Sequence, residues 1–230
     1  MSEFFLESSM AGVVVSLLSY YVGTVINRKW KLAILNPLLI AIVFVTGFLL
    51  LFQVDYDTYN NSAKYLSDLL TPATVSLAIP LYRQMELLKE NAAAIIAGIF
   101  SGVLTSLCSI LVLAELFHLS HEEYVTLLPK SITTAIGLAV SEELGGYAVI
   151  TVAGIILTGL LGNIAAETLC RIFRIKYPVS KGLAIGTASH AMGTAKAMEM
   201  GEIEGAMSSL AIVVSGLCTV AGAAVFAEFL

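Results

Sequence analysis

The chain of 230 residues is 58% hydrophobic and 13% charged, whereas about 25% of the residues in an ordinary soluble domain are charged. Its mean hydropathy is +0.90 and its net charge is −5. The composition excludes a soluble globular protein, because a fold of this size cannot hide so much apolar surface. It also excludes a nucleic-acid-binding protein, which needs a broad basic face.

Five apolar runs are long enough, or nearly so, to cross about 30 Å of hydrocarbon as helices of roughly 20 residues. They cover residues 9–26, 31–52, 92–114, 147–166 and 206–227. Backbone groups in lipid must bond internally, so each run is predicted to be a helix and not a strand. The predicted fold class is an all-α integral membrane protein, a multi-span helical bundle.

Three further stretches are apolar but interrupted by Pro, Gly, Ser, Thr, Lys or His. They cover residues 69–82, 127–140 and 182–198. Proline removes a backbone donor and glycine loosens a helix, so such stretches enter a membrane only where protein or a water-filled cavity covers the freed backbone groups. We expect broken or re-entrant segments here. No composition shift marks a second domain, so a single membrane domain over residues 1–230 is expected.

The broken segments resemble one another. Each contains Ala-Ile followed by a helix breaker, beginning at Ala78, Ala135 and Ala184, and each precedes a long apolar run. Internal symmetry with interrupted segments is typical of transporters built from inverted repeats. The expected repeat units are residues 129–174 and 178–230, and the alternative is chance similarity between apolar helices.

The distribution of positive charge orients the predicted spans, because cytoplasmic loops are rich in Lys and Arg. The first loop carries Arg28, Lys29 and Lys31. The most basic loop carries Arg171, Arg174, Lys176 and Lys181. The two loops lie on the same side if residues 127–140 dip into the membrane and return. Residues 182–198 would then form a second hairpin from the opposite face. A model with eight full crossings is the alternative.

His190 is the first candidate for a functional residue, because ionisable residues at membrane depth are costly and usually face a bundle interior or a wet cavity. Its neighbours Thr187, Ser189 and Thr194, together with nearby glycines, suit an unwound stretch with exposed amides and hydroxyls. We expect these four residues to bind substrate. His190, with a reference pKa of about 6.5, would carry a co-transported proton. The alternative is a neutral histidine bonded to a backbone carbonyl.

Lys130 is the second candidate, and it is followed by Ser131, Thr133 and Thr134. A lysine beside hydroxyls and a helix N-terminus suits the binding of a carboxylate or a phosphate. The alternative is a lysine whose amine reaches the membrane interface. Lys196 leaves the same two interpretations open.

Enzyme motifs are absent from the sequence. It contains no GxSxG, HExxH or Walker pattern, so an enzyme or an ATP-driven pump is not expected. His118 and His121 lie in a polar loop and the three cysteines form no CxxC pair, so no metal or other cofactor is expected. Gly98 and Gly102 form a pair suited to close helix contact, and a homodimer is the expected oligomer.

Four stretches carry a resemblance to the LrgB/CidB family of bacterial membrane proteins. They are residues 35–39 (LNPLL), 66–82 (LSDLLTPATVSLAIPLY), 128–134 (LPKSITT) and 182–211 (GLAIGTASHAMGTAKAMEMGEIEGAMSSLA). The resemblance implies a multi-pass protein of the cell membrane. It implies a holin-like or antiholin-like role that modulates murein hydrolase activity and autolysis, with a smaller LrgA/CidA-type partner. Wider relatives are linked to the movement of pyruvate, and plastid relatives to that of glycolate and glycerate.

Two functions follow from these observations. The first is a transporter or facilitator of a small monocarboxylate such as pyruvate or glycolate, bound between the two broken segments. The second is a holin-like or antiholin-like protein of autolysis. The polar interruptions favour a specific site, whereas a lesion-forming pore needs large oligomers and little internal specificity.

Overall fold

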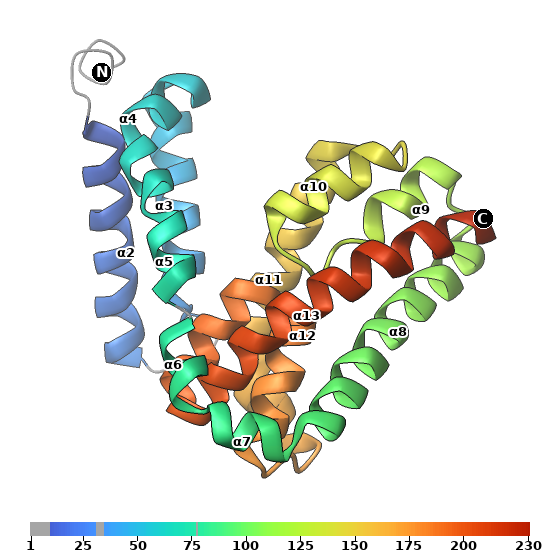
Figure 1. The fold of residues 1–230 in the computed structure, drawn as a ribbon. Helices are drawn as coiled ribbons and strands as arrows, with labels where there is room; N and C mark the ends of the chain where they lie inside the picture. The colour runs from blue at the N-terminus through green and yellow to red at the C-terminus, as the bar shows by residue number, and fades with distance from the viewer. Residues whose placement is uncertain (1–9, 31–34, 77) are drawn as a thin grey trace. The chain divides into compact units, whose positions relative to one another are not determined.

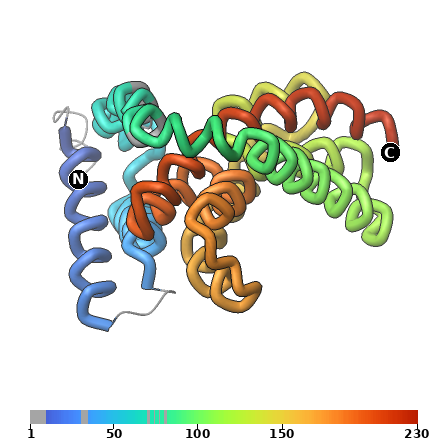
Figure 2. The backbone as a smooth tube through the Cα atoms, turned by 60° about the horizontal axis from the view of Figure 1, so that its bottom comes forward, coloured from blue at the N-terminus to red at the C-terminus, as the bar shows by residue number. Residues whose placement is uncertain are grey.

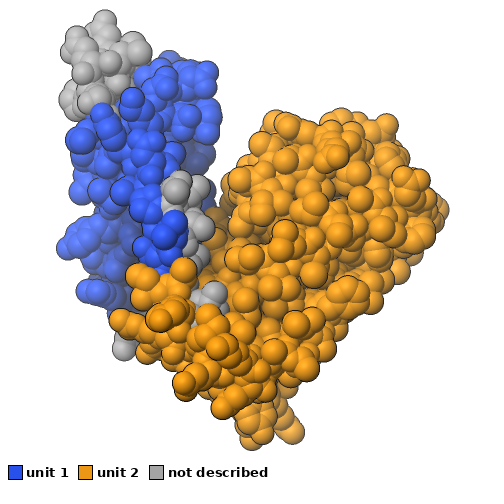
Figure 3. Space-filling view, in the orientation of Figure 1, with its two compact units in different colours: residues 1–76 blue, residues 77–230 orange. Residues whose placement is uncertain are grey.

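The computed structural model describes residues 10–30, 35–76 and 78–230, and in these ranges it contains helices and turns but no strand. Lys31, used above for orientation, lies outside the described residues, as do the first residues of the predicted runs 9–26 and 31–52. The chain divides into two compact units, residues 1–76 and 77–230, coloured separately in Figure 3. Each unit is described by itself. The expectation of a single membrane domain stays a prediction.

The described residues of the first unit, 10–30 and 35–76, form four helices. They are α2 (Ala11–Trp30), α3 (Pro37–Leu51), α4 (Tyr56–Asp68) and α5 (Leu70–Ser76). Asn36 starts α3, because its side chain accepts a hydrogen bond of 2.8 Å from the Leu38 amide while Pro37 occupies the first turn. Ser62 joins α4 to α2 by accepting a bond of 3.0 Å from the Gly12 amide.

The second unit contains the remaining elements, labelled in Figure 1. They are α6 (Ala78–Arg83), α7 (Met85–Glu90), α8 (Ala92–Phe117), α9 (His121–Leu127), α10 (Thr134–Glu143), α11 (Ala148–Ile172), α12 (Pro178–Met200), α13 (Glu202–Phe226) and a final 3-10 turn (Ala227–Phe229). The described residues of the first predicted broken segment, 69–82, include the short helices α5 and α6, and residue 77 between them lies outside the described residues.

Three of the described helices are long and apolar enough to cross a membrane. They are Ala92–Phe117, Ala148–Ile172 and Glu202–Phe229, and they confirm the last three predicted spans. The second predicted span is shorter than expected, since α3 has 15 residues and extends only about 22 Å. The prediction of an all-α integral membrane protein is confirmed.

The core of the second unit forms along one face of α8. Its buried residues recur every three or four positions, as Ile95, Ile99, Val103, Leu107, Ile110 and Ala114. They pack with Tyr124 and with Ala206, Met207 and Ala211 of α13. Exposed apolar residues occupy other faces of α8, including Ile96, Phe100 and Val112. A helix that is apolar on its exposed face suits a lipid environment.

The end of α13 lies beside α9, as both Figures 1 and 2 show. The Tyr124 hydroxyl donates a hydrogen bond of 2.9 Å to the Phe226 carbonyl, and His121 Nδ1 lies 2.9 Å from the Leu230 carbonyl oxygen. These contacts close the end of the unit at which α8 also finishes.

The second predicted broken segment is a re-entrant hairpin, called hairpin A, which runs from Thr126 in the last turn of α9, through the turn over residues 128–133, and along α10 to Ser141. These two residues meet at the start of α11. The Thr151 hydroxyl there lies 3.0 Å from the Thr126 carbonyl oxygen and 2.6 Å from Ser141 Oγ. Near its tip, a Cβ added to Gly137 would lie 3.3 Å from the Pro129 carbonyl oxygen, so the two arms touch. The chain therefore enters and leaves on the same side.

The third predicted broken segment is also a hairpin, called hairpin B, formed by α12. The backbone leaves the helical region at Ser189 (φ −137°, ψ 19°) and His190 (φ 43°, ψ −138°). Before this break, Gly186 packs against Ser208 of α13. After it, the Thr194 hydroxyl lies 2.7 Å from Ser208 Oγ. Both arms therefore lie against the same part of α13, and the chain reverses at residues 189–190.

The two hairpins approach the middle of α11 from opposite ends. Hairpin A contacts Thr151 near the start of α11, whereas the returning arm of hairpin B pairs Lys196 with Glu167 near its end, at 2.7 Å. Between these points, Ile155 and Gly159 contact His190 at the tip of hairpin B. The expectation of broken or re-entrant segments is thus confirmed for residues 127–140 and 182–198. Whether residues 129–174 and 178–230 are true repeats stays a prediction.

Candidate functional site

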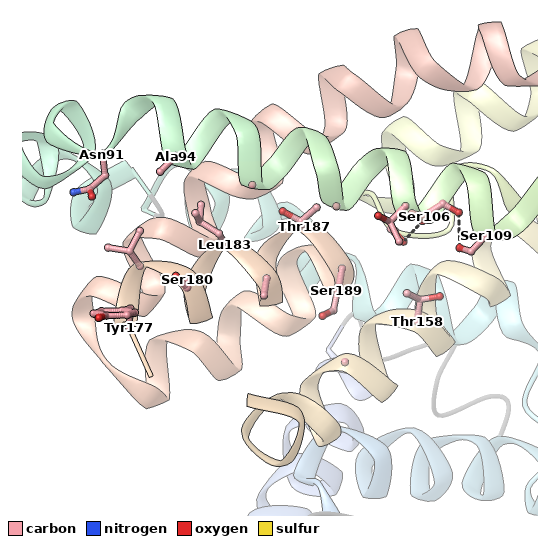
Figure 4. A pocket seen from close by; sticks show the side chains of 18 of the residues that line it. Asn91, Ala94, Ser106, Ser109, Thr158, Tyr177, Ser180, Leu183, Thr187 and Ser189 are labelled. Atoms are coloured by element: carbon pink, nitrogen blue, oxygen red, sulfur yellow. Dashed lines mark hydrogen bonds between the residues drawn. The ribbon is translucent and has the colours of Figure 1, made fainter. Parts of the chain in front are cut away.

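The tips of both hairpins border a cavity of about 990 Å³ within the second unit (Figure 4). Hairpin A contributes Lys130 and Ser131, and hairpin B contributes Thr187, Ala188 and Ser189. One side of α8 and the middle of α11 complete the wall. Their polar residues are Asn91, Thr105, Ser106, Ser109 and Thr158. The structure therefore brings together four of the eight predicted site residues, namely Lys130, Ser131, Thr187 and Ser189.

Lys130 is the only cationic side chain among the described lining residues, and no carboxylate lies among them. Its amine donates hydrogen bonds to Ser131 Oγ at 3.0 Å and to Ser106 Oγ at 3.4 Å. Among the ion pairs of the described ranges, none includes Lys130. A half-buried ammonium with two hydroxyl partners and no counter-charge is suited to bind an anion.

Thr187 lines the same cavity as Lys130, and its hydroxyl has no hydrogen-bond partner among the described residues. Its side chain is 91% buried, since only 9% of its surface is exposed. Its Oγ1 has no hydrogen-bond partner in the part of the chain that the structure describes. Buried hydroxyls are nearly always hydrogen-bonded, so a partner from a ligand or a water is expected. Gly102 lets α8 pack closely against Thr187, because a Cβ there would lie 2.9 Å from Thr187 Cγ2.

The returning arms of both hairpins have the same helix polarity at their tips. The returning arms of the two hairpins are α10, which begins at Thr134, and the part of α12 after His190. Both arms therefore begin near a hairpin tip, where the helix dipole is positive. Helix N-termini directed at an anionic group are a recurring feature of transporter sites.

Ser189 closes the cavity at the tip of hairpin B. Its Oγ donates a hydrogen bond of 2.9 Å to the Ile185 carbonyl oxygen. It packs directly against Gly162 of α11, which also lines the cavity. A larger residue than glycine at position 162 would overlap Ser189, so the glycine lets the hairpin tip meet the spanning helix.

His190 lies on the other side of the backbone break and is not among the cavity-lining residues. Its ring is buried, and Nε2 lies 3.1 Å from the Ile155 carbonyl oxygen. Because a carbonyl oxygen only accepts, this contact requires the proton on Nε2. The geometry matches the alternative that the sequence left open, a histidine bonded to a backbone carbonyl, and it gives His190 a role in placing the hairpin tip.

Three other predicted residues also lie away from the cavity. Thr194 is buried, and its hydroxyl donates to the His190 carbonyl oxygen at 2.9 Å. Thr133 precedes the first turn of α10 without a side-chain capping bond, and Thr134 is exposed. Thr194 therefore bonds to the backbone of hairpin B and does not reach the cavity wall. Thr133 and Thr134 do not reach it either.

Sequence reasoning missed the hydroxyls that α8 and α11 contribute. Ser106, Ser109 and Thr158 lie in spanning helices that are mostly apolar. The signal was the spacing of Thr105, Ser106 and Ser109, which places their side chains near one another on a helix. A hydroxyl in a spanning helix often bonds its own backbone, as Ser109 does to the Ser106 carbonyl oxygen at 2.9 Å. Spacing alone therefore does not identify a site.

A second cavity of about 680 Å³ lies at the base of hairpin B and is lined by charges of both signs. Lys181 lines it and lies 3.8 Å from Glu204. Lys196 pairs with Glu167 at 2.7 Å and with Glu199 at 3.1 Å, and both carboxylates line this second cavity. The Lys196–Glu167 pair fastens the returning arm of hairpin B to α11. The two interpretations of Lys196 stay predictions.

The fold and the site define a polytopic helical membrane protein with two hairpins that meet at a polar cavity. The family model described as the LrgB-like family matches residues 16–229, and the chain belongs to this family. It is 38% identical over 229 residues to the antiholin-like protein LrgB of Bacillus subtilis (strain 168), covering 98% of this chain and 99% of that protein. It is 37% identical over 220 residues to the protein of the same name from Bacillus cereus (strain B4264), covering 95% and 96%. No solved structure matches the chain.

Proposed function

We propose that this protein carries a small monocarboxylate, such as pyruvate or glycolate, across the cell membrane. The observation that supports this most directly is the Lys130 amine, which faces the cavity without an ion-pair partner in the described ranges. A carboxylate would neutralise this charge and accept its hydrogen bonds. Charge-assisted hydrogen bonds of this kind are about twice as strong as neutral ones.

The arrangement of the hairpins supports a carrier and not a simple pore. In this proposal Lys130 and Ser131 hold the carboxylate from hairpin A, while Thr187 and Ser189 contact it from hairpin B. A solute bound between two tips that enter from opposite ends is released to either side when one hairpin moves. With the basic loop after α11 on the cytoplasmic side, the base of hairpin B faces the cytoplasm and that of hairpin A the outside.

The second candidate is an antiholin-like role in autolysis, and the names of the relatives support it. In this proposal the chain acts with a smaller LrgA/CidA-type membrane protein and forms a homodimer in the bilayer. The two functions are compatible, because altered carboxylate or proton balance would itself affect the control of autolysis. Gly98 and Gly102, suggested by sequence as a dimer contact, both line the cavity of their own chain.

The proposed function is tested with the purified full chain in proteoliposomes. Labelled pyruvate, glycolate and glycerate are offered with and without a pH gradient, and a fluorescent dye is encapsulated in parallel. Saturable uptake of one acid with retention of the dye is the expected result. Dye release without selective uptake contradicts a carrier and favours a pore. If neither solute moves, the same assay with the LrgA/CidA-type protein co-reconstituted decides between the two functions.

A further inference from the structure

The cavity is much longer than the acids considered above. Along α8 its lining runs from Asn91 to Ser109, which corresponds to about 27 Å at the rise of an α-helix. A three-carbon acid is only about 4 Å long at ordinary bond lengths. The volume of about 990 Å³ also lies at the upper end of the range for cavities that bind drug-sized ligands. A small acid bound at Lys130 would leave most of the cavity volume unfilled by the ligand.

The polarity of the wall changes along this length. Figure 4 places Ser106, Ser109 and Thr158 toward one end and Asn91 and Tyr177 toward the other. Between the two ends the wall is mostly apolar, with Ser180 as a hydroxyl among its residues, and the apolar sleeve is defined here as Ala94, Gly98, Val179 and Leu183. Burial of aliphatic groups against such a wall is favourable, by an amount proportional to the apolar area removed from water.

The width of the sleeve depends on Gly98. A Cβ added there would have Leu183 Cδ1 as its nearest neighbour, at 3.8 Å, which is an ordinary van der Waals distance. A methyl group therefore fits without a clash, whereas a longer side chain would extend from α8 toward α12 and fill the sleeve. The glycine keeps open a space that the fold itself does not need.

We propose that the site takes monocarboxylates with an apolar chain of about four to eight carbons, whose carboxylate binds at Lys130 and whose chain lies along the apolar sleeve. The inference rests on the proposed function, since it uses the same carboxylate site. The unpartnered Thr187 hydroxyl lies between the two parts and suits a 2-oxo or 2-hydroxy group next to the carboxylate.

The test is isothermal titration calorimetry of the purified full chain with one series of 2-oxo acids: pyruvate, 2-oxobutanoate, 2-oxohexanoate and 2-oxooctanoate. The head group is constant and only the apolar chain grows. We expect the affinity to rise about two- to fourfold for each added methylene through the whole series to 2-oxooctanoate. An affinity that does not rise with chain length overturns the inference.

A pair of variants separates the sleeve from non-specific partition into detergent. Gly98→Leu fills the sleeve and should lower the ratio of 2-oxohexanoate affinity to pyruvate affinity at least tenfold. Gly154→Leu is the matched control, because Gly154 lies on α11 outside the cavity and has no neighbour within 4 Å of an added Cβ. In Gly154→Leu, the ratio of 2-oxohexanoate affinity to pyruvate affinity should equal that of the wild type. If Gly98→Leu does not bind pyruvate, this ratio is measured for Ala94→Leu instead, and the same decrease is expected.

The outcomes distinguish this inference from the proposed function. If pyruvate binds but longer acids bind no better, the inference fails and the proposed function stands. If the preference for longer acids is unchanged in Gly98→Leu, the chain lies elsewhere and the inference fails. If no acid of the series binds to the wild type, both fail.

Discussion

The Nε2 atom of His190 lies 3.1 Å from the carbonyl oxygen of Ile155, and this contact joins the tip of hairpin B to the middle of α11. Position 190 has a positive φ of 43°, which is uncommon for a residue with a side chain. The ring packs against Gly159, where an added Cβ would lie 2.7 Å from His190 Cε1. The histidine thus holds the break in place while Ser189 remains at the cavity.

His190→Ala should lower stability because it removes the second hydrogen bond that the Ile155 carbonyl oxygen accepts, beside its bond within α11, and opens a void at Gly159. We expect a loss of about 1–3 kcal/mol in the free energy of unfolding. Thermal unfolding of the purified protein in detergent measures it, with Thr134→Ala, an exposed position, as the control. Wild-type stability combined with a complete loss of uptake would instead assign His190 a direct part in transport.

Gly159→Ala should disturb the same contact from the side of α11. The added methyl group has to displace the His190 ring or the Met192 sulfur, both within 2.8 Å of its position. Overpacking of this kind costs about 1–3 kcal/mol. Gly154→Ala on the same helix has open space and should be neutral or slightly stabilising. Equal unfolding temperatures for the two variants would contradict the packing described here.

Thr187→Val should affect uptake more than stability. The exchange keeps the shape of the side chain and removes a hydroxyl that has no partner in the described structure, so the folded state loses no internal hydrogen bond. We expect the KM for uptake to rise about fivefold, corresponding to about 1 kcal/mol for a lost hydrogen bond. The comparison is Thr194→Val, which removes a bond to the His190 carbonyl oxygen and should mainly lower stability. An unchanged KM in Thr187→Val would remove Thr187 from the site.

Glu167→Gln should change stability by less than about 1 kcal/mol. Its ion pair with Lys196 measures 2.7 Å, but half of the Glu167 side chain is exposed and Lys196 keeps Glu199 as a second partner. Partly exposed pairs contribute little because water and salt screen them. Unfolding curves at low and high salt check this. A loss of several kcal/mol would show that the base of hairpin B depends on this pair.

Composition and the positions of helix-breaking and polar residues were sufficient to predict much of the fold. The three longest spans follow from uninterrupted apolar runs, and both hairpins follow from apolar segments that contain Pro, Gly and polar residues, although hairpin B reverses at Ser189 and His190 and not at a glycine. The second span was predicted too long, because hydropathy does not register that Asn36 and Pro37 together start a helix. Its 15 residues extend less than the thickness of the hydrocarbon.

The site was predicted in part, for a physical reason. Lys130 and Ser189 lie at polar breaks, and broken backbone at membrane depth has to face protein or a cavity, which brought both tips into the prediction. Sequence cannot tell which side of a break faces the cavity, so His190 was grouped with Ser189 although they lie on opposite sides. The serines of α8, such as Ser106, were missed because an isolated hydroxyl in a spanning helix is commonly satisfied by its own backbone.

The central claim is that the Lys130 amine binds the carboxylate of the transported solute, and uptake of labelled pyruvate into proteoliposomes tests it most directly. Lys130→Gln keeps most of the side-chain volume and a hydrogen-bond donor but removes the charge. Lys196→Gln is the control, because Lys196 lies outside the cavity and is paired with Glu167 and Glu199. We predict that Lys130→Gln lowers the initial rate of uptake at least tenfold while Lys196→Gln remains near the wild-type rate. Wild-type uptake by Lys130→Gln would contradict the account.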